Sequence, residues 1–386
     1  MNTEFHTHKI NVALVIPSLC YGGAERQVTE IARKLDRNRF EVHIIILTDY
    51  TPLLTEDDEL RRNLHVVEKS GKLPLSVVWR LRTLFIKLNI QMAHSFLFYA
   101  EIATRIAAKM AGVEFVIGSE RNTDYKLAIF REKLLYMTRN MTNAIIANSQ
   151  AGAKFHSKLY NLPGSKYWVV TNGIDIQRFR VRDKIECKKK LGFGKDTILI
   201  GMFASFKTQK NHLQLFTAMK GMVKKFNKVH LLLVGDTLYT DFGNTLEYNK
   251  QVMKAMKDTG IDQIATILGN RTDVETIYPA CDFTVLPSFR EGTPNVVLES
   301  LACGVPVVVT DVSDNVTLVT NGEDGFVVPI NNVPALQSRI EELCMNAELR
   351  TAMGKRARQT AERRFSTQVM CDNMGAAYEA IIQAAS

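Results

Sequence analysis

The chain has 386 residues, which is too long for one compact core and suits two domains of ordinary size. Its hydrophobic fraction of 46% and charged fraction of 23% exclude a disordered chain, a collagen-like repeat and a low-complexity array. With 49 Lys and Arg against 40 Asp and Glu, the net charge is +9. This surplus predicts an anionic partner: nucleic acid, a membrane surface or a phosphorylated substrate.

The start of the chain and its cysteines favour a reducing compartment. Residues 1–10 are polar, and no stretch has the roughly 18 consecutive apolar residues of a membrane-spanning helix. No two of the six cysteines form a CxxC pair, which disfavours a zinc ribbon or a redox motif. We therefore expect a cytoplasmic protein without a cleavable leader or a membrane span, with its cysteines as thiols.

In chain order, short runs rich in Val and Ile alternate with helical patterns. The first half has predicted strands at 10–17, 42–47, 115–118, 144–147 and 168–170, and predicted helices at 24–35, 77–88, 102–110 and 130–139. The second half has predicted strands at 197–204, 229–234, 265–268, 283–286 and 305–310, and predicted helices at 296–302 and 366–384. Unbroken apolar strands between helices indicate parallel sheets that are covered on both faces. The expected fold class is therefore α/β, with doubly wound parallel sheets.

A polar, highly charged stretch at 178–196 predicts a boundary between two domains. Residues 1–180 carry 25 Lys and Arg against 17 Asp and Glu, whereas residues 181–386 carry 24 against 23. Nearly all of the excess positive charge therefore lies in the first domain.

Two loops at predicted strand ends carry glycine or lysine, and ligands bind at such strand ends in open α/β sheets. The first loop contains Gly22 and Gly23, which let a ligand approach the backbone, although a tight turn explains them equally well. The second loop contains Ser205, Lys207 and Lys210. Lysine suits phosphate, and a solvated helix start is the alternative interpretation.

A third loop gives the sharpest signal. Glu291 lies in the loop after a predicted strand, and Glu299 lies within the following helix. This spacing can direct both carboxylates to one ligand, while the helix N-terminus between them offers N–H groups and a positive dipole to phosphate. A glutamate on an apolar helix face also needs a partner. A solvated Glu299 and a capping Glu291 are the alternative.

The segment Glu291-Gly-Thr-Pro-Asn-Val-Val-Leu-Glu299 resembles the Glu-x7-Glu motif of the family-4 retaining glycosyltransferases, which have the GT-B fold. The first loop's Gly-Gly-Ala-Glu-Arg and the stretch Val170-Thr-Asn-Gly-Ile-Asp175 are similar to that family as well. The resemblance implies two Rossmann-like domains facing a central cleft. Residues 1–180 with the last helix, 370–386, would form the acceptor side, and residues 181–369 would bind the nucleotide sugar.

The resemblance also implies roles for individual residues. Lys210 would bind the donor diphosphate, Glu291 would face the donor sugar, and Glu299 would hold the ribose hydroxyls. Gly22 and Gly23 would close over the phosphates from the first domain. Backbone groups of five residues would surround the sugar and the phosphates: Gly292, Thr293, Pro294, Asn295 and Val296. Glu291 and Lys210 are thus the candidates for catalysis.

The implied reaction moves a hexose or N-acetylhexosamine, with retention, from a UDP- or GDP-linked sugar to a polysaccharide or lipid-linked oligosaccharide. The departing phosphate would take the acceptor's proton, and Lys210 with the helix dipole would stabilise the leaving diphosphate. The sequence has no Asp-x-Asp motif, so neither a metal nor a cofactor is expected.

Two positions depart from the family pattern. Ser205 stands where the family commonly has an arginine, and Lys207 is a candidate to supply the missing charge. The family often has an acceptor-facing histidine after a first-domain strand, and the corresponding stretch here has none. Glu120 or Arg121 is expected to point into the cleft instead, with Arg121 meeting an acceptor phosphate. A salt bridge at the cleft rim is the alternative.

The predicted helices at 77–88 and 130–139 mix apolar and basic residues, as helices that lie on anionic membranes do, although ordinary surface helices look similar. With the positive first domain, they predict peripheral association with the inner face of the cell membrane and no nucleic-acid partner. Two rivals remain: a GT-B sugar-nucleotide epimerase, and a non-catalytic basic protein that binds membrane or nucleic acid. The aromatic and glycine spacing of known RNA modules is absent, which disfavours the second rival.

Overall fold

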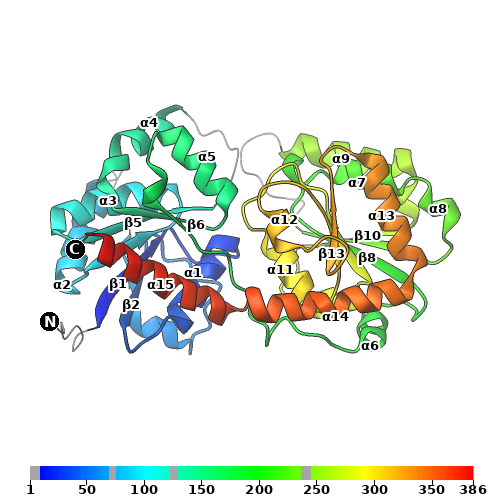
Figure 1. Ribbon diagram of the computed structural model, residues 1–386, viewed down its shortest axis with the longest axis horizontal. Coiled ribbons are helices and arrows are strands. Elements are labelled where there is room, and N and C mark those ends of the chain that lie inside the picture. The colour runs from blue at the N-terminus through cyan, green and yellow to red at the C-terminus, as the bar shows by residue number, and fades with distance from the viewer. Residues whose placement is uncertain (1–8, 69–74, 122–128, 236–244, 386) are drawn as a thin grey trace. The chain divides into compact units, whose positions relative to one another are not determined.

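The computed structural model describes residues 9–68, 75–121, 129–235 and 245–385. The chain forms two compact units: unit 1 comprises residues 1–173 and 367–386, and unit 2 comprises residues 174–366 (Figure 1). The division falls a few residues before the boundaries at 180 and 370 that the sequence suggested. The reason is that the Ile174 N–H donates to the carbonyl of Phe365, and Phe179 packs into the core of unit 2.

Unit 1 contains a seven-stranded sheet in the order β3-β2-β1-β4-β5-β6-β7, in which each pair is parallel. Its strands are β1 (Ile10–Ile16), β2 (Phe40–Ile46), β3 (Leu64–Val66), β4 (Met92–Ser95), β5 (Phe115–Glu120), β6 (Ala144–Ala147) and β7 (Tyr167–Val169). Its α-helices are α1 (Gly23–Lys34), α2 (Leu75–Lys87), α3 (Phe98–Ala111), α4 (Ile129–Thr138), α5 (Gln150–Tyr160) and α15 (Thr367–Ala385).

Strand β1 shows why the sheet of unit 1 is buried on both faces. Val12, Leu14 and Ile16 belong to one core cluster, to which the C-terminal helix α15 contributes. Ala13 and Val15 belong to a second cluster, which includes residues of α2 and α3. Successive side chains of a strand point to opposite faces, so a continuous apolar run is the sequence of a strand between two helix layers. The C-terminal helix, red in Figure 1, lies beside α1 in this layer.

Unit 2 repeats this architecture with a six-stranded sheet in the order β10-β9-β8-β11-β12-β13, again with parallel pairs. Its strands are β8 (Ile198–Phe203), β9 (Val229–Val234), β10 (Ala265–Gly269), β11 (Phe283–Leu286), β12 (Val307–Thr310) and β13 (Gly325–Val328). Its α-helices are α6 (Lys184–Lys190), α7 (His212–Met219), α8 (Met222–Lys225), α9 (Thr245–Thr259), α10 (Val274–Ile277), α11 (Asn295–Ala302), α12 (Asn315–Leu318), α13 (Val333–Met345) and α14 (Ala347–Arg364).

The doubly wound α/β class is confirmed, and each of the ten predicted strands overlaps a strand of the structure. Three further strands gave no signal in the sequence. β3 is a half-exposed edge strand of three residues, β4 carries the polar His94 and Ser95, and β13 begins at Gly325 after a polar turn. The six cysteines are free thiols, and five of them are buried.

Candidate active site

Two of the predicted ligand loops of unit 2 lie side by side. The loop with Ser205, Lys207 and Lys210 follows β8, and the loop with Glu291 follows β11. Because β8 and β11 are parallel neighbours in the sheet, their carboxyl ends meet at one edge, where ligands bind in open α/β folds. The N–H of Phe289 donates to the carbonyl of Gln209 at 2.8 Å and joins the two loops directly.

The structure brings Lys210 and Glu291 into contact, although they are 81 positions apart in the sequence. Lys210 Nζ lies 2.5 Å from Glu291 Oε1, and the hydroxyl of Ser288 donates to the same oxygen at 2.6 Å. The two side chains are only 16% and 7% exposed. An ammonium group is therefore held at a fixed position at the sheet edge, next to a carboxylate that is already oriented.

Ser313 fixes the backbone at Glu291. The Glu291 N–H donates to Ser313 Oγ at 3.2 Å, and the Ser313 hydroxyl donates to the Glu291 carbonyl. Ser313 itself adopts a left-handed backbone conformation with φ 52°. Sequence reasoning missed both Ser288 and Ser313, because an isolated serine gives no signal until the fold places it beside the glutamate.

Glu299 lies on the buried side of α11 and has a specific partner. It is 6% exposed, and the hydroxyl of Tyr278 donates to its Oε2 at 2.7 Å. The ring of Tyr278 stacks on Phe203, with centroids 3.6 Å apart. Burial and the Glu299 charge raise the pKa of Tyr278 well above its usual range, so the phenol stays a donor. Tyr278 is thus a positioning residue for Glu299 that the sequence did not reveal.

The segment between the two glutamates begins helix α11. Gly292, Thr293 and Pro294 are buried, and Asn295 and Val296 are half-buried. Pro294 is the N-cap residue of α11 and makes no side-chain hydrogen bond to the helix. Its side chain offers no acceptor for the first N–H groups, and the positive end of the helix dipole lies at this segment.

The remaining predicted residues of unit 2 occupy the turn after β8. Lys207 has an exposed side chain, its N–H donates to the Ser205 carbonyl at 2.7 Å, and its carbonyl accepts from the N–H of Lys210 at 2.9 Å. Gly235, at the end of β9, packs against this turn. A Cβ on Gly235 would lie 2.1 Å from the carbonyl oxygen of Ala204, so only glycine allows this close approach. The role of Lys207 as a substitute cation stays a prediction.

In unit 1, Gly22 and Gly23 stand at the carboxyl end of β1, where α1 begins. A Cβ on Gly22 would lie 2.0 Å from Glu25 Oε2, so the loop needs glycine there if the Glu25 carboxylate is to keep its place. The carboxylate is itself held, because Cys20 Sγ donates to Glu25 Oε1 at 3.2 Å.

Glu120 and Arg121, at the carboxyl end of β5, face different surroundings. Glu120 is 5% exposed, and its Oε2 lies 3.8 Å from His156 Nε2 inside unit 1. Arg121 Nη1 donates to Asn172 Oδ1 at 2.8 Å, and its guanidinium lies over the ring of Phe96. Arg121 is therefore the stronger candidate of the two for a ligand contact.

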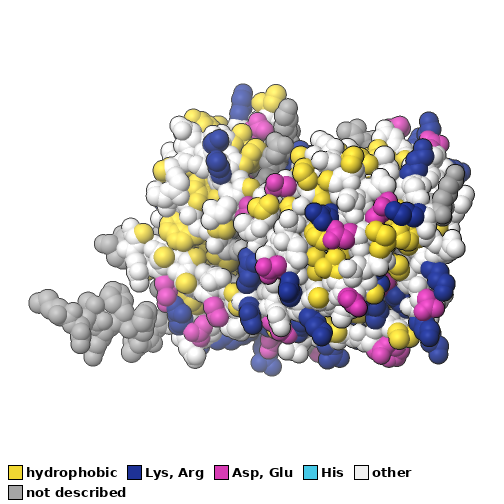
Figure 2. Space-filling model, turned by 45° about the vertical axis from the view of Figure 1, so that its right-hand side comes forward, with side chains coloured by type: hydrophobic (Ala, Val, Ile, Leu, Met, Phe, Trp, Pro, Cys, Tyr) yellow, Lys and Arg dark blue, Asp and Glu magenta, His cyan; other side chains and the backbone are white. Residues whose placement is uncertain are grey.

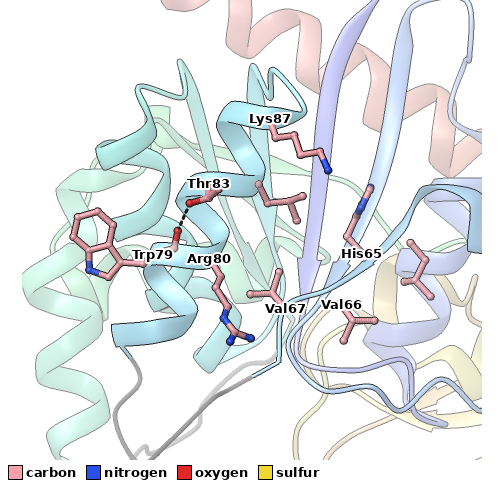
Figure 3. A pocket seen from close by; sticks show the side chains of 9 residues that line it. His65, Val66, Val67, Trp79, Arg80, Thr83 and Lys87 are labelled. Atoms are coloured by element: carbon pink, nitrogen blue, oxygen red, sulfur yellow. Dashed lines mark hydrogen bonds between the residues drawn. The ribbon is translucent and has the colours of Figure 1, made fainter.

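A separate hollow of about 600 Å³ in unit 1 contains none of the predicted site residues. It is open and lies between the edge strand β3 and helix α2, with Val66 and Val67 on one side and Trp79, Arg80 and Lys87 on the other (Figure 3). Groups of three or more His, Cys, Asp or Glu side chains suited to a metal ion do not occur among the described residues.

Comparisons with known proteins agree with this architecture. The family model described as Glycosyltransferase Family 4 matches residues 21–178, and the model described as Glycosyl transferases group 1 matches residues 183–360. Among solved structures, Anabaena HepE in complex with UDP aligns with a TM-score of 0.83 at 20% identity, over 96% of this chain and 100% of that one. This likeness shows the fold, which is GT-B.

Two curated relatives are similar in sequence. The UDP-Gal:alpha-D-GlcNAc-diphosphoundecaprenol alpha-1,3-galactosyltransferase of Escherichia coli is 27% identical over 85% of this chain and 86% of its own length. The capsular polysaccharide biosynthesis glycosyltransferase CapM of Staphylococcus aureus is 27% identical over 55% of this chain and 54% of its own length. With two family models spanning residues 21–178 and 183–360, the chain belongs to the family-4 glycosyltransferases of the GT-B fold.

Proposed function

We propose that this chain is a retaining glycosyltransferase that moves a hexose or N-acetylhexosamine from a UDP-linked sugar to a lipid-linked oligosaccharide or polysaccharide. The observation that carries the proposal is the contact between Lys210, in the loop after β8, and Glu291, in the loop that precedes α11. The ammonium group and the helix dipole would stabilise the charge of the departing diphosphate, so the reaction is proposed to need no metal. The departing phosphate would take the acceptor's proton on the same face of the sugar, which keeps the anomeric configuration.

The other site residues have proposed roles in binding the donor. Glu299, oriented by Tyr278, would hold the ribose hydroxyls, and Glu291 would face the sugar. Backbone groups from residues 292–296 would surround the sugar and phosphates, and Gly22 and Gly23 would close over the phosphates. The E. coli relative is by name a UDP-Gal transferase for a diphosphoundecaprenol acceptor, and HepE is solved with UDP; both names favour UDP over GDP.

A nucleotide screen tests the donor assignment. UDP and UDP-sugars are expected to raise the melting temperature of the protein, because a ligand that binds only the folded state stabilises it. The Glu299→Ala variant should lose this response, and Tyr278→Phe should weaken UDP binding by about tenfold, since a hydrogen bond to the charged carboxylate is lost. Glu348→Ala, an exposed glutamate of α14, is the matched control.

Product analysis then separates the proposed reaction from its rivals. Nuclear magnetic resonance of the product should show the anomeric configuration of the donor, and EDTA should leave the rate unchanged. An altered sugar nucleotide formed without acceptor would identify an epimerase instead. A nucleotide screen without any response, from GDP as well as UDP, would overturn the donor site.

The acceptor is proposed to be reached at the inner face of the cell membrane. No helix in the described part of the chain combines the length and the apolarity that crossing a bilayer requires. Helix α4, however, leaves Ile129, Phe130 and Met137 between 70% and 74% exposed, with Arg131 and Arg139 on the same short helix and the turn that follows it. On the face that it draws, Figure 2 shows apolar side chains at the surface among Lys, Arg, Asp and Glu side chains. Exposed apolar residues beside cations suit an anionic bilayer.

Vesicle sedimentation tests this surface. The protein is expected to sediment with phosphatidylglycerol vesicles at low salt and to be released as the salt concentration rises. The variant Phe130→Ser/Met137→Ser should bind at least tenfold more weakly, because each buried apolar side chain contributes about 1.5–3 kcal/mol. Met345→Ser removes a methionine of unit 2 that is 64% exposed, and this variant should bind the vesicles as the wild type does. Equal binding by all three proteins would exclude α4 as the contact.

A further inference from the structure

Arg121 is a half-buried cation whose guanidinium nitrogens are only partly partnered by the described residues. It follows β5 directly, at the carboxyl edge of the unit 1 sheet. Its Nη1 donates to Asn172 Oδ1 at 2.8 Å, and its guanidinium lies 5.0 Å from the centroid of the Phe96 ring. Nε and Nη2 are buried, and neither has a hydrogen-bond partner among the described residues. Buried N–H groups of a charged side chain are costly to leave unpaired, so this arrangement calls for a ligand.

The two unpaired nitrogens share one edge of the guanidinium group. Nε–H and Nη2–H point the same way, and this edge binds a phosphate or carboxylate through two parallel N–H···O bonds. Asn172 binds the opposite edge of the guanidinium group, and the Phe96 ring lies against its face. These two contacts fix the direction of the Nε–Nη2 edge. Burial lowers the pKa of Arg121 to about 10, which leaves it cationic at neutral pH.

Neighbouring groups support the position of Arg121 without occupying its free edge. Glu120 accepts from the backbone N–H of Arg121 at 2.8 Å with Oε1, while its Oε2 lies near His156. His94, on the neighbouring strand β4, is fully buried and bridges Tyr378 and Ser119 at 2.7 and 2.8 Å. The ring of His94 packs on Phe96, with centroids 4.3 Å apart, and thereby supports the aromatic face under the guanidinium.

We propose that the free edge of Arg121 binds a phosphate group of the acceptor, as in a lipid-linked diphosphate. This inference rests on the proposed function, because that function includes an acceptor. Its geometric basis is separate, because the donor diphosphate already has Lys210 and the N-terminus of α11 in unit 2. A phosphate on the acceptor is an anion for which no side chain has yet been assigned, and a bidentate arginine suits it better than a lysine would.

A binding experiment with saturating UDP tests this proposal. UDP fills the donor site, and geranyl diphosphate then serves as the probe for a second phosphate site, with geraniol as the probe without phosphate. The wild-type protein is expected to bind geranyl diphosphate clearly more tightly than geraniol. Arg121→Gln should weaken the binding of geranyl diphosphate by about 100-fold, because it removes both the charge and the two parallel N–H donors. Arg121→Lys should weaken it by about tenfold, because it keeps the charge but loses the two parallel donors. Arg62→Gln, an exposed arginine of unit 1, is the matched control.

Each outcome bears on a different assignment. Unchanged binding of geranyl diphosphate by Arg121→Gln, or no binding by the wild type, would overturn the acceptor-phosphate site. A loss of UDP affinity in Arg121→Gln would place Arg121 on the donor phosphates instead. If Arg121→Gln fails to fold by circular dichroism, Arg121→Lys decides the question. Failure of the proposed function would appear separately, as a wild-type protein that does not bind UDP.

Discussion

Replacing Lys210 by alanine is expected to lower kcat/KM for the sugar donor by about 100- to 1,000-fold, the usual effect of removing a preorganised group that stabilises developing charge. The variant loses the ammonium group that lies 2.5 Å from Glu291 Oε1. It also leaves the Glu291 carboxylate, 7% exposed, without its cation, so negative charge accumulates where the diphosphate departs. Steady-state kinetics with a UDP-sugar and an acceptor measure the effect.

Lys220→Ala is the control for Lys210, because Lys220 is an exposed lysine at the end of α7 in the same unit. It should leave kcat/KM unchanged within about twofold. A loss below tenfold for Lys210→Ala would contradict its role at the diphosphate. Lys207→Ala tests the substitute-cation hypothesis in the same assay: a weaker donor interaction supports it, and unchanged affinity and turnover would refute it.

The sequence predicted the fold class and the loops of unit 2, and physical reasons explain why. Apolar runs buried on both faces give a strong signal, and Glu291 and Glu299 lie close enough in sequence to be seen as one motif. Tyr278, Ser288 and Ser313 were not predicted, because they act only through contacts that the fold creates. A tyrosine that orients a glutamate 21 positions later leaves no periodic trace in the sequence.

In unit 1, the sequence left Glu120 and Arg121 as equal candidates. Adjacent residues at the end of a strand point to opposite faces, so at most one of them can address a given ligand. The structure places the Glu120 carboxylate near His156 and leaves one edge of Arg121 without a hydrogen-bond partner in the part of the chain that it describes. This distinction depends on which face each helix covers, and the order of residues alone does not determine that.

The largest expected effect on stability is at Asp282, which precedes β11. Its Oδ2 accepts from Lys188 Nζ at 2.7 Å and from the Leu199 N–H at 2.9 Å, and Lys184 and Arg350 lie within 4 Å of Oδ1. Asp282 and Lys188 are 5% and 4% exposed. Asp282→Asn leaves the Lys188 ammonium buried without a counter-charge, so we expect a loss of about 3–5 kcal/mol in the free energy of unfolding. Urea unfolding followed by far-ultraviolet circular dichroism measures this loss.

The same residue predicts a dependence on pH with a definite sign. Burial acts to raise the pKa of Asp282, but Lys184 and Lys188 outweigh it and lower that pKa below its usual value. The stabilisation is therefore present above the pKa of an unfolded aspartate, about 3.9, and is lost as pH falls through the lower pKa of the folded state. The wild-type protein should lose more stability on acidification than Asp282→Asn does.

Asp273 provides the matched control for Asp282, because it pairs with Arg271 at the surface of the same unit. The two side chains are 43% and 38% exposed, and surface pairs of this kind contribute about 1 kcal/mol or less. Asp273→Asn should therefore unfold at nearly the wild-type urea concentration. If Asp282→Asn and Asp273→Asn lower the free energy of unfolding by the same amount, the buried ion pairs of Asp282 do not hold α6 and β8 together. Hydrophobic packing alone must then account for that part of the core.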